Sequence, residues 1–384
     1  MPRDQERIED ALIVRFGCFA LTVQPDRPFP EVSGAIVRAL DDDSRVTSLT
    51  PPDLDPSYDE HILVYPSSRG ADPDSVVTGS DVLVGVSLSG VLKFELSVPL
   101  KNQPTFTADE TPPAEHYYVI WDRYSLMLGW QQNAETPIPR AGGQVIRDVL
   151  NVAAKKMQGR QYIQSCSPWC THLFAHQELR IRTRPGAQGF SLSEPRGAPL
   201  RAVIDVHVPP GDDVWGLLAK TYRSCQVSMQ NFYEMKNLGR RTLDIGVVID
   251  QDIFQLMSLH YERAALRRER IWTRISSLRN IARWRRESRL LLARLGIALP
   301  TFELFRRKWN ERRVFYDRAA AARGIAVMFE DHLDDEAAIE AFDTTSQRAT
   351  LSEMSGRLDN AALIGATVAV AAAAIIGVVL GHFL

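Results

Sequence analysis

The sequence contains few of the features that mark secreted proteins and common enzymes. Four cysteines in 384 residues, Cys18, Cys166, Cys170 and Cys225, are too few for a disulfide scaffold and fit a reducing compartment. Residues 1–7 contain no apolar run of the kind found in signal peptides, so we expect a protein that is not exported. Neither a Gly-x-Ser-x-Gly nucleophile motif nor a Gly-x-x-x-x-Gly-Lys-Ser/Thr phosphate loop is present. The lack of a complete catalytic motif predicts a non-enzymatic protein without a cofactor.

Charge is close to balance overall but is unevenly distributed along the chain. Residues 261–313 contain 16 Arg and Lys against 5 acidic residues, a surplus of 11. Because the whole chain has a net charge of −2, the remainder carries −13. Arg outnumbers Lys by 38 to 7, which together with abundant Ala suggests a GC-rich bacterial coding sequence.

The first 210 residues predict an α+β domain with a mixed sheet. Residues 11–23 form an apolar run rich in strand-forming side chains. Further strands are predicted at 61–65, 81–88, 91–98, 116–121 and 200–208, and helices at 32–40 and 143–157. Gly90 supplies the positive φ of a tight hairpin between 81–88 and 91–98. Pro209 and Pro210 mark the expected end of this domain.

Residues 211–360 predict a helical, Arg-rich stalk or bundle. Apolar spacing indicates helices at 214–237 and 243–296, a third after Pro300 and a fourth from Asp334 or Asp335. In the second of these helices, an approximate coiled-coil seam includes Ile253, Met257 and Leu292.

Residues 361–384 predict a C-terminal transmembrane anchor. They contain no Asp, Glu, Lys or Arg, and at about 1.5 Å per residue they would span about 36 Å, more than the roughly 30 Å hydrocarbon core. A buried helix of a soluble domain is the alternative. Arg348 and Arg357 precede the span, so we expect the N-terminal bulk to be cytoplasmic. The sequence therefore predicts a tail-anchored, single-pass protein, with the bacterial inner membrane as the expected location.

Small residues recur every fourth position within the predicted anchor. They are Gly365, Ala369, Ala373, Gly377 and Gly381. A stripe of this kind lets two membrane helices approach closely, which predicts a homo-oligomer. The alternative is an Ala-rich anchor that does nothing beyond inserting.

Two thiols and two imidazoles fall within eleven residues. Cys166, Cys170, His172 and His176 are ligand types that tetrahedral zinc accepts. If Thr171 opens a helix, the two histidines lie one turn apart on one face. A structural zinc site is one interpretation, and small buried cysteines beside partly exposed histidines is the other.

The basic segment interleaves arginine with tryptophan. Its predicted membrane-surface residues are Arg267, Arg268, Arg270, Trp272, Arg274, Arg283, Trp284, Arg285 and Arg286. Such a helix can lie along anionic lipid headgroups. Pairing of the arginines with the acidic remainder of the chain is the alternative. Nucleic acid is a weaker one, because no binding motif accompanies the charge.

The order of parts, an α/β domain and then long helices leading to a C-terminal membrane segment, resembles the layout of CorA-type divalent cation transporters. That family has two spans and a Gly-Met-Asn signature. This chain has neither the triplet nor a second predicted span, so no site residue carries over. The sequence favours a membrane-anchored sensor, adaptor or effector, with a possible small-molecule ligand for residues 1–210. A transporter or channel subunit and a zinc-containing membrane-tethered enzyme are the alternatives.

Overall fold

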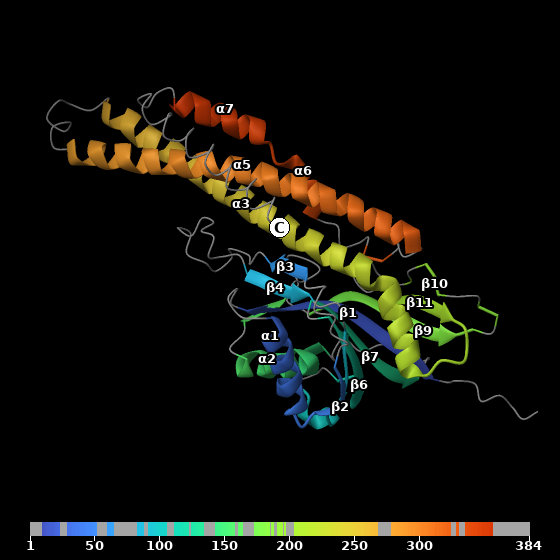
Figure 1. The fold of residues 1–384 in the computed structure, drawn as a ribbon. Helices are drawn as coiled ribbons and strands as arrows, with labels where there is room; N and C mark the ends of the chain where they lie inside the picture. The colour runs from blue at the N-terminus through green and yellow to red at the C-terminus, as the bar shows by residue number, and fades with distance from the viewer. Residues whose placement is uncertain are drawn as a thin grey trace, which may run out of the picture. The chain divides into compact units, whose positions relative to one another are not determined.

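The computed structural model confirms a fold in which a mixed sheet precedes long helices (Figure 1). The described residues are 10–23, 29–51, 60–64, 83–87, 91–105, 111–122, 124–133, 143–157, 160–163, 173–184, 186–187, 190–194, 196, 203–267, 278–323, 328–329 and 335–355. The α+β class is therefore correct.

The chain forms two compact units. The first contains residues 1–66, 79–237 and 311–334, and the second contains 67–78, 238–310 and 335–384. Two long helices, α3 (Val214–Arg267) and α5 (Leu278–Arg323), contribute to both units. The unit that contains the sheet thus includes the start of the helical region. The domain limits at 210 and 360 stay predictions.

The first unit contains eleven described strands. They are β1 (Asp10–Val23), β2 (Val46–Thr50), β3 (Glu60–Val64), β4 (Leu83–Ser87), β5 (Leu92–Ser97), β6 (His116–Trp121), β7 (Ser125–Asn133), β8 (Arg160–Ile163), β9 (Phe174–Thr183), β10 (Ser191–Leu192) and β11 (Val203–Val208). The main order is β10-β11-β9-β1-β7-β6-β5-β2, with β4 and β8 also paired to β1. β9 and β11 run parallel while the other neighbouring strands run antiparallel, so the sheet is mixed.

The predicted hairpin between β4 and β5 is wrong. β4 pairs with β1 and β3, whereas β5 pairs with β2 and β6. The two strands therefore belong to different parts of the sheet, and a local turn signal gave a false partner. The strands themselves are confirmed, and the alternating burial of Leu92, Phe94 and Leu96 matches the pattern read from the sequence.

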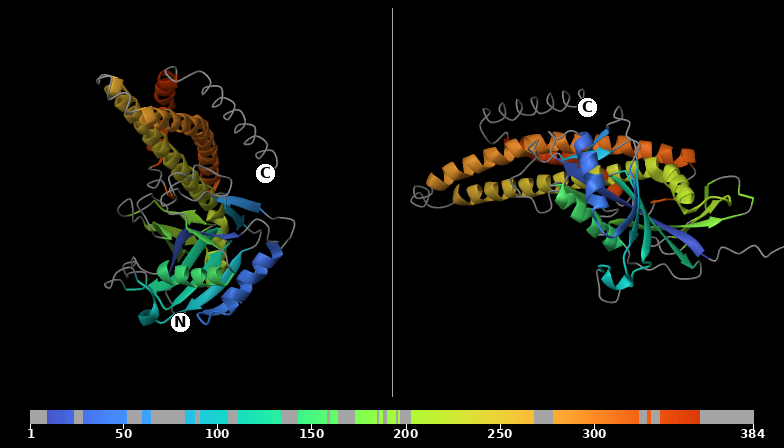
Figure 2. Two further views of the ribbon diagram at one scale, coloured as in Figure 1. Left: turned by 90° about the vertical axis from the view of Figure 1, so that its left-hand side faces the viewer. Right: turned by 60° about the horizontal axis from the view of Figure 1, so that its bottom comes forward.

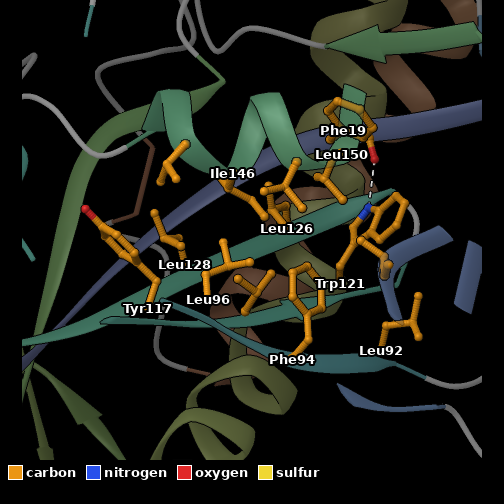
Figure 3. Close-up of a cluster of buried hydrophobic side chains, with 14 of the residues drawn as sticks. Phe19, Leu92, Phe94, Leu96, Tyr117, Trp121, Leu126, Leu128, Ile146 and Leu150 are labelled. Atoms are coloured by element: carbon orange, nitrogen blue, oxygen red, sulfur yellow. Dashed lines mark hydrogen bonds between the residues drawn. The ribbon is translucent and has the colours of Figure 1, made fainter. Parts of the chain in front are cut away.

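Helices α1 (Phe29–Asp41) and α2 (Gly143–Lys156) cover one face of the sheet (Figures 1 and 3). Ile146 and Leu150 of α2 pack against a fully buried layer of strand side chains. In this layer the Trp121 indole N–H donates to the Phe19 carbonyl at 2.9 Å, and the two rings meet edge to face. Burial also raises the pKa of Tyr117 to about 12. Each large side chain buried here stabilises the fold by about 1.5–3 kcal/mol.

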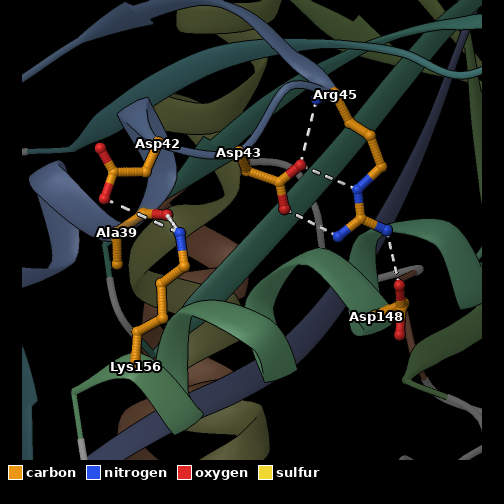
Figure 4. Close-up of polar contacts among 6 residues, drawn as sticks. All are labelled: Ala39, Asp42, Asp43, Arg45, Asp148 and Lys156. Atoms are coloured by element: carbon orange, nitrogen blue, oxygen red, sulfur yellow. Dashed lines mark hydrogen bonds and ion pairs between the residues drawn. The ribbon is translucent and has the colours of Figure 1, made fainter.

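An ion-pair clamp joins the α1–β2 connection to α2 (Figure 4). The Arg45 guanidinium binds both oxygens of Asp43, at 2.9 and 2.7 Å, and reaches Asp148 of α2 at 2.5 Å. The hydrogen bond from Arg45 lowers the pKa of Asp43. Lys156, also on α2, lies 3.8 Å from Asp42. Arg45, with Asp43 and Asp148, holds the connection against α2, whereas the exposed Asp42 contributes little.

The opposite face of the sheet is covered by the first part of α3, within the first unit. A side chain at Gly129 of β7 would collide with Leu218, which shows how closely helix and sheet approach. Farther along α3, the Tyr233 hydroxyl donates to the Phe16 carbonyl at 3.3 Å. Residues 125–130 of β7 are buried on both faces, so this part of the strand is mostly apolar instead of alternating.

The long helices cross two positions where the sequence predicted breaks. α3 runs unbroken through residues 238–242, and α5 contains Pro300 in its interior instead of starting after it. Pro300 has no N–H to donate to the Gly296 carbonyl, so α5 lacks one backbone hydrogen bond at that turn. The Thr301 hydroxyl donates to the Ile297 carbonyl at 2.7 Å, which satisfies a neighbouring acceptor. The local proline rule therefore gave the wrong helix start.

In the second unit, α3 and α5 lie side by side (Figure 2). The segment that follows them contacts both: Phe342 packs on Phe302 of α5, and Gln347 donates to Asp250 of α3. α6 (Asp335–Ala341) begins where the sequence predicted, but the expected single helix is divided, because α7 (Thr344–Ser355) starts anew. Asp343 caps α7 by accepting hydrogen bonds from the backbone N–H groups of Thr345 and Ser346. The predicted coiled-coil seam is wrong at Met257, which is exposed, while Ile253 is buried.

The predicted anchor, 361–384, lies outside the described residues. Among the helices that are described, none combines the length and the apolar character needed to cross a bilayer. The transmembrane helix and the stripe Gly365, Ala369, Ala373, Gly377 and Gly381 therefore stay predictions.

Candidate functional site

The N-terminal part of α5 separates leucines from arginines by helical spacing. Leu291, Leu292 and Leu295 are buried in the second unit and fix which face of the helix points inward. Arg285, Arg286 and Arg289 precede them on turns that leave the guanidinium groups exposed. The apolar contacts of one face thus determine the exposure of the basic face.

Two arginines in the same region are occupied by carboxylates. Arg283 donates to Glu287 one turn away at 2.6 Å, which raises the pKa of Arg283. Arg294 lies 3.2 Å from Asp252, a carboxylate on α3 that is almost completely buried. Both pairs link positions within the helical unit, so these arginines have structural partners.

Arg285, Arg286 and Arg289 form a cluster of a different kind. Together with Leu290 they line a shallow, open hollow of about 430 Å³. Among the described residues, no carboxylate lines it and none of the three arginines forms an ion pair. Three guanidinium groups around one hollow offer forked N–H donors to a single anion, and phosphate oxygens match this geometry best. We call these four residues the arginine hollow.

The arginine hollow coincides with only part of the predicted membrane surface. Four residues of that surface lie on α5: Arg283, Arg285 and Arg286, which are exposed, and Trp284, which is half-buried. Arg267 ends α3, and nothing is described of its side chain; Arg268, Arg270, Trp272 and Arg274 lie outside the described residues. Prediction of the surface omitted Arg289 and Leu290. Their spacing of three and four residues from Arg286 could have placed them on the same side of the helix.

A second charged group that sequence reasoning missed is buried in the first unit. Asp122, between β6 and β7, has no exposed surface and accepts five hydrogen bonds. Two come from the backbone N–H groups of Tyr124 and Ser125, at 2.9 and 2.6 Å. The other three come from α3: Tyr222 at 2.8 Å, Gln226 at 3.3 Å and Gln230 at 2.8 Å.

The Asp122 cluster fastens α3 to the sheet. Tyr222, Gln226 and Gln230 are four residues apart, so they form one polar line on an otherwise apolar helix face. That line is the signal from which the cluster could have been found. Burial raises the pKa of Asp122, and the donors offset part of this effect. Because the carboxylate is closed to solvent and surrounded by neutral donors, its arrangement suits a structural anchor better than a binding site.

Three of the four predicted zinc ligands lie outside the described residues. Cys166, Cys170 and His172 are outside the described residues, and His176 falls in β9. The expected helix through His176 is wrong, because Phe174–Thr183 is a strand that pairs with β1 and β11. The described residues contain no cluster of three or more metal-ligating side chains. Zinc binding by the four residues stays a prediction, but it can no longer depend on a helix that places His172 and His176 one turn apart.

Comparisons with protein-family models, curated proteins and solved structures found no match to this chain. The candidate site therefore depends on geometry and charge.

Proposed function

We propose that the protein is a membrane-anchored, non-enzymatic sensor, adaptor or effector whose second unit binds anionic phospholipid headgroups in the arginine hollow. The observation that supports this proposal is the set of three exposed arginines that share one hollow without a described carboxylate partner. Residues 361–384 would hold the chain at the bilayer, where headgroup phosphates are present at high local concentration.

The electrostatic contribution of the hollow is large enough to matter. A basic residue at an anionic membrane surface gains about 1 kcal/mol, so three arginines gain about 3 kcal/mol. This corresponds to a preference for anionic over zwitterionic lipid of about 100-fold, since 1.4 kcal/mol is a factor of ten. Arg283 and Arg294 would add less, because each already has a carboxylate partner.

Leu290 gives the hollow an apolar element that free phosphate would not need. Its side chain is 57 % exposed beside the three arginines. At a bilayer surface an exposed leucine can enter the boundary between headgroups and acyl chains while neighbouring arginines bind phosphate. The combination favours a lipid headgroup over a soluble anion.

Lipid that co-purifies with the full-length chain tests this proposal. We expect Arg285→Gln, Arg286→Gln and Arg289→Gln, combined, to reduce the anionic phospholipid recovered per chain several-fold. Quantitative lipid mass spectrometry after extraction in a mild detergent measures it.

A matched control removes three positive charges elsewhere. Arg307, Arg318 and Arg348 are exposed and do not line the hollow, so their combined change to Gln should leave lipid recovery close to the wild type. Equal loss in both triple variants would mean that net charge alone attracts lipid, and no loss in the first would overturn the proposal.

The other functions read from the sequence depend on residues outside the described part. The transporter interpretation depends on membrane spans, and the zinc-enzyme interpretation depends on Cys166, Cys170 and His172. Both stay predictions.

A further inference from the structure

A line of exposed apolar side chains runs along α3 in the second unit. Val247, Phe254 and Tyr261 are seven residues apart, and Met257 lies between the last two. Phe254 and Tyr261 are 73 % and 72 % exposed. Exposed apolar side chains that lie next to one another mark an interaction surface. The opposite face of the helix is the packed one, since Ile249, Ile253 and Leu256 are buried. We call the four exposed residues the α3 stripe.

We propose that the α3 stripe is a self-association surface on which α3 of a second copy packs antiparallel, about a two-fold axis at Phe254. The seven-residue period is the spacing at which two helices keep a common seam in contact. The α3 helix of a second copy has the same seven-residue spacing of exposed apolar side chains, so the two stripes can stay in contact along their length. This inference goes beyond lipid binding and concerns a different helix.

Charge separates this occupant from a membrane. Between Thr242 and Glu262 the helix has no Lys or Arg and has four acidic residues. An anionic bilayer would repel such a segment, in contrast to the arginine hollow of α5. Gln251, Gln255 and Ser258 beside the stripe are uncharged, and Asp250 is the one charged residue among the positions that face the second copy.

The antiparallel direction follows from the same residues. With the axis at Phe254, Val247 faces Tyr261 of the second copy, a small side chain against a large one, and Asp250 faces Ser258. In a parallel pair, Asp250 would face Asp250 within the seam, where the two like charges would repel each other. Within one chain, Asp250 already accepts a hydrogen bond from Gln347 of α7 at 2.8 Å.

Cysteine crosslinking of the full-length chain tests the surface and its direction. Under mild oxidation, Phe254→Cys should form a disulfide dimer, whereas Gln255→Cys, exposed one residue away, should not exceed the background of the native cysteines. A mixture of Val247→Cys and Tyr261→Cys chains should crosslink to each other. Equal yields at 254 and 255 would overturn the surface, and self-crosslinking of Val247→Cys alone would overturn the antiparallel arrangement.

Molar mass measured by light scattering in detergent provides a second readout. Phe254→Glu places a charge at the axis and should halve the mass, while Gln255→Glu should not change it. Both variants are made in a chain with Gly365→Leu, Gly377→Leu and Gly381→Leu, so that the predicted anchor stripe does not hold the copies together. An unchanged mass for Phe254→Glu, with unchanged helical content by circular dichroism, would contradict the proposal.

Discussion

Asp122 in the first unit and the arginine hollow in the second both place charge where no described opposite charge neutralises it. Asp122 is completely buried and accepts five hydrogen bonds from neutral donors. Arg285, Arg286 and Arg289 are exposed and face a hollow open to solvent. The same lack of an ion pair therefore has opposite meanings in the two units.

The difference lies in what replaces the missing partner. Around Asp122 the protein itself supplies every donor, so the charge is satisfied and is inaccessible to any ligand. The arginines of the hollow are exposed to solvent, so an anion can reach them without rearranging the fold. A buried charge with a full set of donors indicates structure, whereas exposed charges converging on one hollow indicate binding.

The largest expected effect is the loss of the buried carboxylate. Asp122→Ala leaves five donors without their acceptor and should lower the free energy of unfolding by about 3–5 kcal/mol, as removal of one partner from a buried charged network does. Urea unfolding measures the change. Asp42→Ala, which removes a carboxylate that is 72 % exposed, is the control and should cost less than about 0.5 kcal/mol. Equal small losses in both variants would show that the Asp122 network does not hold α3 on the sheet.

Removal of the three hollow arginines should leave the fold intact and change only anion binding. Combined substitution to Gln is expected to change the free energy of unfolding by less than about 1 kcal/mol, because exposed side chains contribute little to stability. Anionic lipid recovered with the wild type should also decrease as salt rises from low to high ionic strength, since the interaction is screened. Salt-independent recovery would contradict an electrostatic site.

The buried carboxylate should also make stability depend on pH. Because the pKa of Asp122 is raised in the folded state, that state binds the proton more tightly than the unfolded chain, whose value is about 3.9. The stability of the wild type relative to Asp122→Asn should therefore decrease as pH rises from about 4. Urea unfolding of both proteins across this range measures the difference, and an increase with pH would reverse the sign of the argument.

The smallest effect is expected at Arg283, beside the hollow but already paired. Arg283→Gln breaks a solvent-exposed ion pair with Glu287 and should leave the free energy of unfolding close to that of the wild type. Lipid recovery should fall less than in Arg286→Gln. A larger loss at Arg283 would show that the ion pair opens to bind lipid and would move the site toward the start of α5.

The spacing of apolar residues in the sequence predicted the strands and helices that have one buried and one exposed face. The strand at 11–23 and the helices at 32–40 and 143–157 were found because their apolar residues follow strand or helix spacing. β7 was missed because both its faces are buried, which removes the alternation that identifies a strand. Asp122 and its helix partners are about 100 residues apart, and no local signal connects them.

The sequence predicted only part of the candidate site, because it shows where arginines occur but not which of them form ion pairs. An arginine-rich helix is visible in the sequence, and Arg285 and Arg286 were among its expected surface residues. Which arginines are paired depends on a distant helix, as for Arg294 with Asp252 of α3. Composition gives the charge of the segment, but the fold decides which charges remain available.

Arginine-selective footprinting tests the central claim, that the arginine hollow binds lipid headgroups, most directly. The full-length chain in lipid nanodiscs is treated with phenylglyoxal, and mass spectrometry follows each arginine. We expect modification of Arg285, Arg286 and Arg289 to slow at least threefold when phosphatidylglycerol is added to phosphatidylcholine, with the exposed Arg318 unchanged. Equal rates in the two lipids, or equal protection by inorganic phosphate in phosphatidylcholine alone, would contradict the account.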